Sequence, residues 1–249
     1  MTDINHYNEQ MKKSLIDKIY FIDKIQTKFF VDYGCADGAM LKFLAPMFPD
    51  SVFLGYDNNL EMIELAEMGE QYENLTFTND INKVINLSGL NDVALILSSV
   101  LHEIYHLHKD DELWNFDIRK INPKYIVIRD MAVSRTSSRP SDSISVAKVW
   151  MNHDTAQLKE WEEQWGSLSE NWSLIHFLLK YRFQDNWDTE LVENYLSYNV
   201  EKLLADIPKG YDPIFIEHYT LPYVRGIVKK DFGIDLQDRT HIKLILERK

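Results

Sequence analysis

The fold can be deduced outward from the stretch Val31-Asp32-Tyr33-Gly34-Cys35-Ala36-Asp37-Gly38. The apolar run from Phe29 to Val31 comes directly before the turn and predicts a buried strand. After the turn, the sequence Ala39-Met40-Leu41-Lys42-Phe43-Leu44 has the apolar spacing of a helix. Strand, glycine turn and helix together are the layout in which backbone N–H groups approach a nucleotide-like ligand. A tight turn that binds nothing is the alternative at this point.

Three more strands are predicted after this turn, and two of them end in a carboxylate. Residues 51–57 form a strand that ends at Asp57, about 20 residues past the glycine turn, where an acidic side chain can accept hydrogen bonds from ribose hydroxyls. Residues 74–80 form a short strand that ends at Asp80, and residues 92–99 form the next one. Because ligands bind at the carboxyl ends of parallel strands, these side chains are expected at one edge of a sheet.

In this order and spacing the sequence resembles the class I S-adenosylmethionine-dependent methyltransferases. The matching pieces lie within residues 28–131, and they are Asp32-x-Gly34-x-x-x-Gly38, Asp57, Asn79-Asp80-Ile81 and Leu97-Ser98-Ser99-Val100-Leu101-His102-Glu103. One departure is Ala36, where many members of the family carry glycine. The resemblance implies S-adenosylmethionine as cofactor. It also implies an α/β, Rossmann-like, seven-stranded methyltransferase sheet with helices on both faces.

The same resemblance implies which residues bind the cofactor. Asp57 would hold the ribose hydroxyls, and Asp80 with Ile81 would meet the adenine. Gly34 would approach the methionine part, and Asp32 would support its ammonium end. The full predicted set is Asp32, Gly34, Cys35, Gly38, Asp57, Asn58, Asp80, Ile81 and Ser98. Taken singly, each aspartate also fits a helix cap or a turn.

The segment after the fourth strand, His102-Glu103-Ile104-Tyr105-His106, matches the HExxH pattern of zinc peptidases. It lies inside a methyltransferase pattern and lacks a Gly-x-x-His continuation, so we assign no metal to it. We interpret His102 as a general base near neutral pH, in an acceptor pocket shared with Glu103. Residues 124–130 form the fifth predicted strand, and Asp130, which ends it, completes the predicted catalytic set. A metal-dependent hydrolase that uses His102, Glu103 and His106 is the weaker alternative.

The remaining chain divides around the predicted cofactor-binding core of residues 28–131. Residues 1–27 form an N-terminal segment with one amphipathic helix over 3–26. Residues 132–212, too long for a plain connection, predict a helical insertion after the fifth strand. Residues 213–249 return to strands that complete the sheet, with the final strand antiparallel as in the resembling fold.

Inside the insertion, predicted helices span residues 143–151, 155–165, 167–180, 189–196 and 200–206. The insertion carries five of the six tryptophans, which fit either its own core or an aromatic wall for the substrate. Its polar opening, residues 134–141, is interpreted as a hinge or lid. We expect a helical cap that decides which acceptor is methylated.

Composition limits the functional classes. The single cysteine, Cys35, excludes an internal disulfide framework and fits a reducing cytosol. The sequence has neither an apolar run of about 18 residues nor a signal-peptide pattern, so a cytoplasmic protein without a membrane span is expected. The net charge of −12 opposes non-specific nucleic-acid binding without excluding a local basic groove. The prediction is therefore methyl transfer to an unidentified small molecule or protein. A non-catalytic S-adenosylmethionine-binding module is the alternative.

Overall fold

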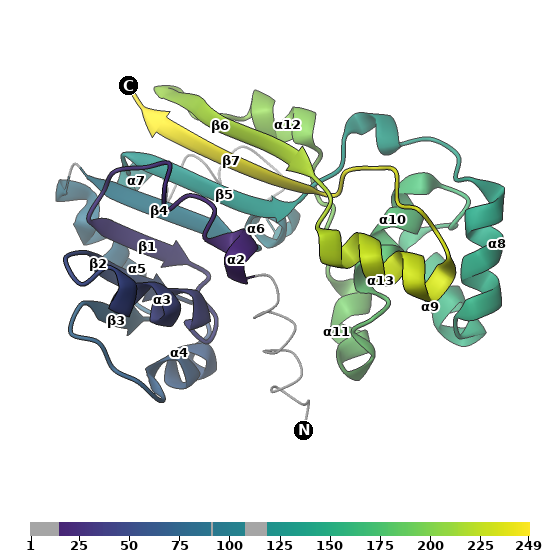
Figure 1. The fold of residues 1–249 in the computed structure, drawn as a ribbon, viewed down its shortest axis with the longest axis horizontal. Helices are drawn as coiled ribbons and strands as arrows, with labels where there is room; N and C mark the ends of the chain where they lie inside the picture. Colours follow the sequence, from purple (N-terminus) through teal and green to yellow (C-terminus); the bar gives the residue numbers. More distant parts are fainter. Residues whose placement is uncertain (1–14, 91, 108–118) are drawn as a thin grey trace. The chain divides into compact units, whose positions relative to one another are not determined.

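The computed structural model describes residues 15–90, 92–107 and 119–249 (Figure 1). Seven strands form one sheet in the order β3-β2-β1-β4-β5-β7-β6. They are β1 (Phe29–Tyr33), β2 (Val52–Tyr56), β3 (Leu75–Thr78), β4 (Val93–Ser98), β5 (Tyr125–Met131), β6 (Tyr211–Tyr219) and β7 (His241–Arg248). The predicted seven-stranded sheet is confirmed.

The first five strands run parallel, and the last strand of the chain runs against them. β1 pairs in parallel with β2 and β4, β2 with β3, and β4 with β5. β7 is antiparallel to β5, because the amide of Ala132 donates to the carbonyl of Thr240 while the amide of Arg248 donates to the carbonyl of Lys124. The carboxyl ends of β1 to β5 therefore meet at one edge of the sheet.

The parallel strands β1, β2, β4 and β5 are mostly buried on both faces, whereas β3 at the edge is partly exposed. Phe30, Phe53 and Ile96 belong to a core that includes α3 (Ala39–Leu44) and α4 (Leu60–Glu67). Val31 and Leu95 alternate with them along their strands and are equally inaccessible to solvent. Burial on both faces explains why these strands are continuous apolar runs in the sequence.

Short helices connect the remaining strands of the core. They are η1 (Ala45–Met47), α5 (Ile81–Ile85), η2 (Asn86–Gly89), α6 (Leu101–Leu107) and α7 (Arg119–Ile121). The sequence from Asn59 to Met68 predicts a helix after Asp57, and α4 confirms it; Asn59 caps this helix, as its side-chain oxygen accepts the amide of Glu61. The sequence also predicts a helix around residues 110–121, stopped before Pro123, and residues 110–118 of it lie outside the described residues.

The single helix predicted over residues 3–26 is wrong in its described part. Only α2 (Leu15–Lys18) is helical there, and turns follow as far as Lys24. Tertiary contacts explain the change. The Tyr20 hydroxyl donates to the carbonyls of Ile128, at 2.8 Å, and Leu244, at 2.9 Å, and Phe21 is fully buried. Residues 3–14 lie outside the described residues.

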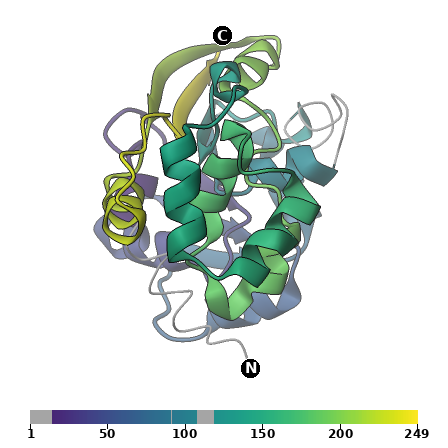
Figure 2. The ribbon, with the colours of Figure 1, turned by 90° about the vertical axis from the view of Figure 1, so that its right-hand side faces the viewer.

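The insertion after β5 is helical, as predicted (Figure 2 faces its helices, in teal and green). Its helices are η4 (Arg135–Ser137), α8 (Ser143–Asn152), α9 (Thr155–Trp165), α10 (Asn171–Lys180), η5 (Gln184–Asn186), α11 (Trp187–Val192) and α12 (Val200–Ala205). α10 begins later than predicted, since the amide of Leu168 is held by the carboxylate of Glu162 and the carbonyl of Ser169 by the amide of Ser141. α11 begins and ends earlier than predicted.

The described residues divide into two compact units, each with its own core. One holds the chain up to Asp130 together with Asp206–Glu217 and Lys243–Lys249, and the other holds Met131–Ala205 with His218–Ile242. The second unit includes α13 (Pro222–Phe232), whose buried Val224, Val228 and Phe232 share a core with Trp161. Among the described helices, none has the length and apolarity that a membrane crossing requires.

Candidate functional site

Chemically active side chains collect at the carboxyl ends of four adjacent strands. Asp32 lies near the end of β1, Asp57 directly follows β2, Ser98 ends β4, and Asp130 is the penultimate residue of β5. The strand register places Asp32 beside both Gly55 of β2 and Ile96 of β4. This edge is where parallel α/β sheets bind their ligands.

The glycine turn after β1 has the backbone that its sequence predicted. Gly34 and Gly38 have φ angles of 80° and 72°, in the left-handed region. A Cβ atom on Gly34 would lie 2.7 Å from Val100, and one on Gly38 would lie 2.4 Å from the Phe77 ring. Both glycines are therefore required by the packing of the fold itself. Ala36 also has a left-handed φ, 47°, which explains why glycine suits this position.

Asp57 joins the glycine turn to the end of β2. One carboxylate oxygen accepts the amide of Ala36 and the other accepts the amide of Asn59, both at 2.9 Å. Each oxygen keeps a second lone pair for another donor. The side chain is half-buried, so it is both fixed by the backbone and within reach of a ligand.

Other residues of the predicted cofactor set have structural roles of their own. Asp80 is exposed and caps α5 by accepting the amide of Asn82 at 3.0 Å, and Ile81 begins that helix. Asn58 is exposed beside Asp57. Burial raises the pKa of the Cys35 thiol well above its ordinary value. The helix-cap interpretation thus holds for Asp80 whether or not it also meets a ligand.

Asp32 is a buried carboxylate without a donor. Its side chain is 4% exposed, and it accepts no hydrogen bond from any residue in the described part of the chain. Burial raises its pKa to about 7, an effect that Lys18 opposes and Asp57 increases. Ser98 is similar, because its buried hydroxyl has no hydrogen-bond partner among the described residues. Polar groups buried without partners are costly and mark places where a ligand supplies the missing contacts.

His102 is held by Asp130 at the same edge. The Asp130 carboxylate accepts the backbone amide of His102 and contacts its Nδ1, both at 2.8 Å. Both side chains are buried, with exposed fractions of 2% and 0%. Because the carboxylate is the acceptor, Nδ1 carries the hydrogen, and Nε2 is the basic nitrogen of the neutral ring. The pair fixes both the tautomer and the orientation of the imidazole.

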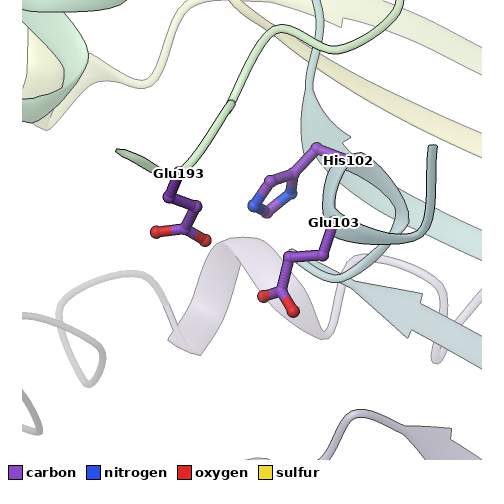
Figure 3. Close-up of side chains that lie close together, drawn as sticks. All are labelled: His102, Glu103 and Glu193. Atoms are coloured by element: carbon purple, nitrogen blue, oxygen red, sulfur yellow. The ribbon is translucent and has the colours of Figure 1, made fainter. Parts of the chain in front are cut away.

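The HExxH motif does not form a zinc-peptidase site. α6 carries all three polar residues of the motif, but His102 is buried whereas Glu103 and His106 are exposed (Figure 3 shows His102 and Glu103). In the described part of the chain, these three residues do not bring their ligand atoms together around one ion. The hydrolase alternative is not supported.

Comparison with solved structures finds S-adenosylmethionine-dependent methyltransferases. One from Anabaena variabilis is 13% identical, with a TM-score of 0.53 over 98% of this chain and 94% of its own. One from Archaeoglobus fulgidus is 16% identical, with a TM-score of 0.53 over 96% and 94%. The chain has the class I methyltransferase fold. The plantazolicin methyltransferase BpumL, in complex with a monoazolic desmethylPZN analog and SAH, is 10% identical, with a TM-score of 0.50 over 98% and 84%.

Sequence comparison adds no closer relative, since no protein-family model and no curated protein matches the chain. The similarity to the methyltransferases therefore rests on the arrangement of strands and helices. A sheet of seven strands with the final strand, β7, antiparallel is what the resemblance of the glycine turn and the ordered carboxylates implied.

Two basic residues near the edge of this methyltransferase sheet have interactions that the sequence did not predict. One local positive group in the sequence could hold an anionic acceptor, and it consists of Arg129, Arg135 and Arg139. Arg129, buried in β5, donates from Nε to Asp17 at 2.8 Å and from Nη1 to the Ser99 hydroxyl at 2.9 Å. It thereby supports Ser99, whose φ of 57° is unusual for a residue other than glycine. Lys18 of α2 is the other. An arginine inside an apolar strand is the signal that the sequence offered for the buried position of Arg129.

The polar opening of the insertion forms several side-chain hydrogen bonds within its own unit, and its interpretation as a hinge or lid stays a prediction. The Ser134 hydroxyl donates to Glu201 at 2.6 Å, and the Ser137 hydroxyl donates to Asp238 at 2.8 Å. Arg139 forms a bidentate pair with the same Asp238, at 2.9 and 2.8 Å. That arginine is therefore already matched to a carboxylate inside its own unit.

Proposed function

We propose that this protein transfers the methyl group of S-adenosylmethionine to an acceptor atom that must lose a proton. Support for the cofactor comes from the methyltransferase fold and from two buried polar groups without partners, Asp32 and Ser98. The structure of BpumL with SAH, which has a similar fold, adds to this support. These residues fit a ligand that brings an ammonium and further polar atoms to the carboxyl edge.

The proposed cofactor contacts follow the order of the strands. Asp57, fixed by two backbone amides, accepts the ribose hydroxyls with its remaining lone pairs. Asp80 and Ile81, at the start of α5, meet the adenine. Cys35, in the turn after β1, and Asn58, in the turn after β2, complete the proposed cofactor set. Asp32 accepts the ammonium, an interaction that favours its ionised form and offsets the cost of burying it.

S-adenosylmethionine supplies an electrophilic methyl group on a sulfonium. The protein's own contribution is to align the acceptor, to exclude water and to receive a proton. His102 Nε2 takes that proton, and Asp130 stabilises the resulting imidazolium through Nδ1. Glu103, exposed on the same helix, is assigned to the acceptor pocket.

The His102–Asp130 pair is the observation that carries this proposal over a module that only binds the cofactor. Cofactor binding needs no oriented base, whereas methylation of a hydroxyl or an ammonium needs one. A small molecule or a protein is the favoured acceptor because the chain has a net charge of −12. The insertion, which follows the carboxyl end of β5, is proposed to select it. Its role as a cap stays a prediction.

The test uses radiolabelled S-adenosylmethionine with fractionated cell extract, followed by purification of the labelled acceptor. His102→Ala is expected to lower transfer by about 100-fold or more, the usual contribution of a general base. Its affinity for S-adenosylhomocysteine should change less than about twofold. His106→Ala is the matched control on the same helix, and it should retain activity since His106 is exposed. Binding of the cofactor without transfer to any fraction would favour the non-catalytic module.

A further inference from the structure

The short helix α2 is anchored at the carboxyl edge of the sheet by several contacts. Asp17 accepts from Arg129 Nε at 2.8 Å and from Lys243 at 2.7 Å. The Tyr20 hydroxyl donates to carbonyls of β5 and β7. Figure 1 shows α2 beside the arrowheads of β1 and β4. The position of this helix is therefore fixed, and so is that of its last residue, Lys18.

Lys18 lies close enough to the acidic edge for its charge to interact with the carboxylates there. Its charge interacts with those of Asp32, Asp37 and Asp130, yet it makes no hydrogen bond or close ion pair with any residue that the structure describes. Burial, together with the like charge of Arg129, lowers its pKa to about 8. An anion placed beside this ammonium would relieve both effects.

Asp32 and Lys18 are thus two opposite charges at one edge, and each lacks a direct partner among the described residues. A ligand that carries an ammonium and a carboxylate on one carbon matches such a pair, as each ligand charge meets its opposite. We propose that Lys18 binds the α-carboxylate of the methionine part of the cofactor while Asp32 binds its ammonium. This inference rests on the proposed function, and it names the residue that binds the carboxylate of the cofactor's methionine part.

The neighbouring cations are less suited to this task. Arg129 already donates to Asp17 and Ser99. Lys243 is paired with Asp17 at 2.7 Å and with Glu217 at 3.5 Å. A lysine is also a compact charge on a flexible stem, which lets it adjust to one carboxylate. Of Lys18, Arg129 and Lys243, Lys18 is therefore the cation that a ligand can bind without breaking a hydrogen bond or ion pair described above.

The experiment measures affinities by calorimetry for three ligands that differ at the amino-acid end. They are S-adenosylhomocysteine, its analogue lacking the carboxylate, and 5′-methylthioadenosine, which lacks both charged groups. Lys18→Met is expected to raise the Kd for S-adenosylhomocysteine about tenfold or more and to leave the other two within about twofold. Lys18→Arg should recover much of the loss. The matched control is Lys28→Met, an exposed lysine just before β1, at the opposite end of that strand.

Each outcome separates the possibilities. A Kd for S-adenosylhomocysteine that is unchanged in Lys18→Met overturns the inference. A lower Kd for S-adenosylhomocysteine in Lys18→Met also overturns it, because the lysine would then have to move aside for the ligand to bind. Equal losses for all three ligands would show a general disturbance of α2 rather than recognition of a carboxylate. If the unaltered protein binds none of the three, the proposed function falls, and the inference falls with it.

Discussion

Replacing Asp32 by asparagine should stabilise the fold while weakening cofactor binding. Burial raises the pKa of Asp32 from 3.8 to about 7 in the folded protein. At about 1.4 kcal/mol per pKa unit, the ionised carboxylate costs at most about 4 kcal/mol of folding free energy at neutral pH. The asparagine amide must also be buried, so we expect a net gain of about 1–2 kcal/mol, or roughly 2–8 °C in Tm for a chain of this size.

The raised pKa of Asp32 also predicts how the stability difference between Asp32→Asn and the unaltered protein changes with pH. Below about pH 4 the carboxyl is protonated in both the folded and unfolded states, and its ionisation costs nothing. Between about pH 4 and 7 only the unfolded state has lost the proton, so the stability of the unaltered protein falls as pH rises, and above about pH 7 the cost is constant. The advantage of Asp32→Asn should therefore grow from pH 5 to pH 7.5 and then level off.

Scanning calorimetry without ligand, at several pH values, measures this advantage directly. Asp50→Asn, at an exposed position, is the control and should show no such trend. The same Asp32→Asn protein should bind S-adenosylhomocysteine at least about tenfold more weakly, because the ammonium loses its charged partner. Equal Tm values at pH 7.5, or an advantage that shrinks as pH rises, would refute the reasoning.

Two further predictions concern the glycine turn. Asp57→Asn should weaken the binding of S-adenosylhomocysteine by about 1.5–3 kcal/mol, since it removes charge-assisted hydrogen bonds to the ribose. An unchanged affinity in calorimetry would contradict the assignment of Asp57 to the ribose. Cys35 should react with iodoacetamide at pH 8 much more slowly than an exposed thiol, because burial raises its pKa and leaves little thiolate. Saturating S-adenosylhomocysteine should slow it further, and mass spectrometry that finds equal labelling rates with and without the ligand would place the cofactor away from the turn.

The strands and the glycine turn were predictable because their signals are local. An apolar run such as Val93–Leu97 needs only burial on both faces to become a strand, and Gly34 needs only a left-handed turn. The extent of α2 was not predictable, because Tyr20 is drawn to carbonyls more than 100 positions along the chain, at Ile128 and Leu244. The unpaired charge of Lys18 was hidden for the same reason, since contacts between distant segments decide it.

The boundary of the insertion shows the same limit. From the sequence, residues 132–212 look separable from the C-terminal strands, but the compact unit also takes in His218–Ile242. The apolar face of α13, formed by Val224, Val228 and Phe232, packs in the same core as the insertion helices. Deleting residues 132–212 alone would expose that face. Any test of acceptor selection by deletion must therefore remove or resurface α13 as well, because otherwise a loss of methyl transfer would report misfolding rather than specificity.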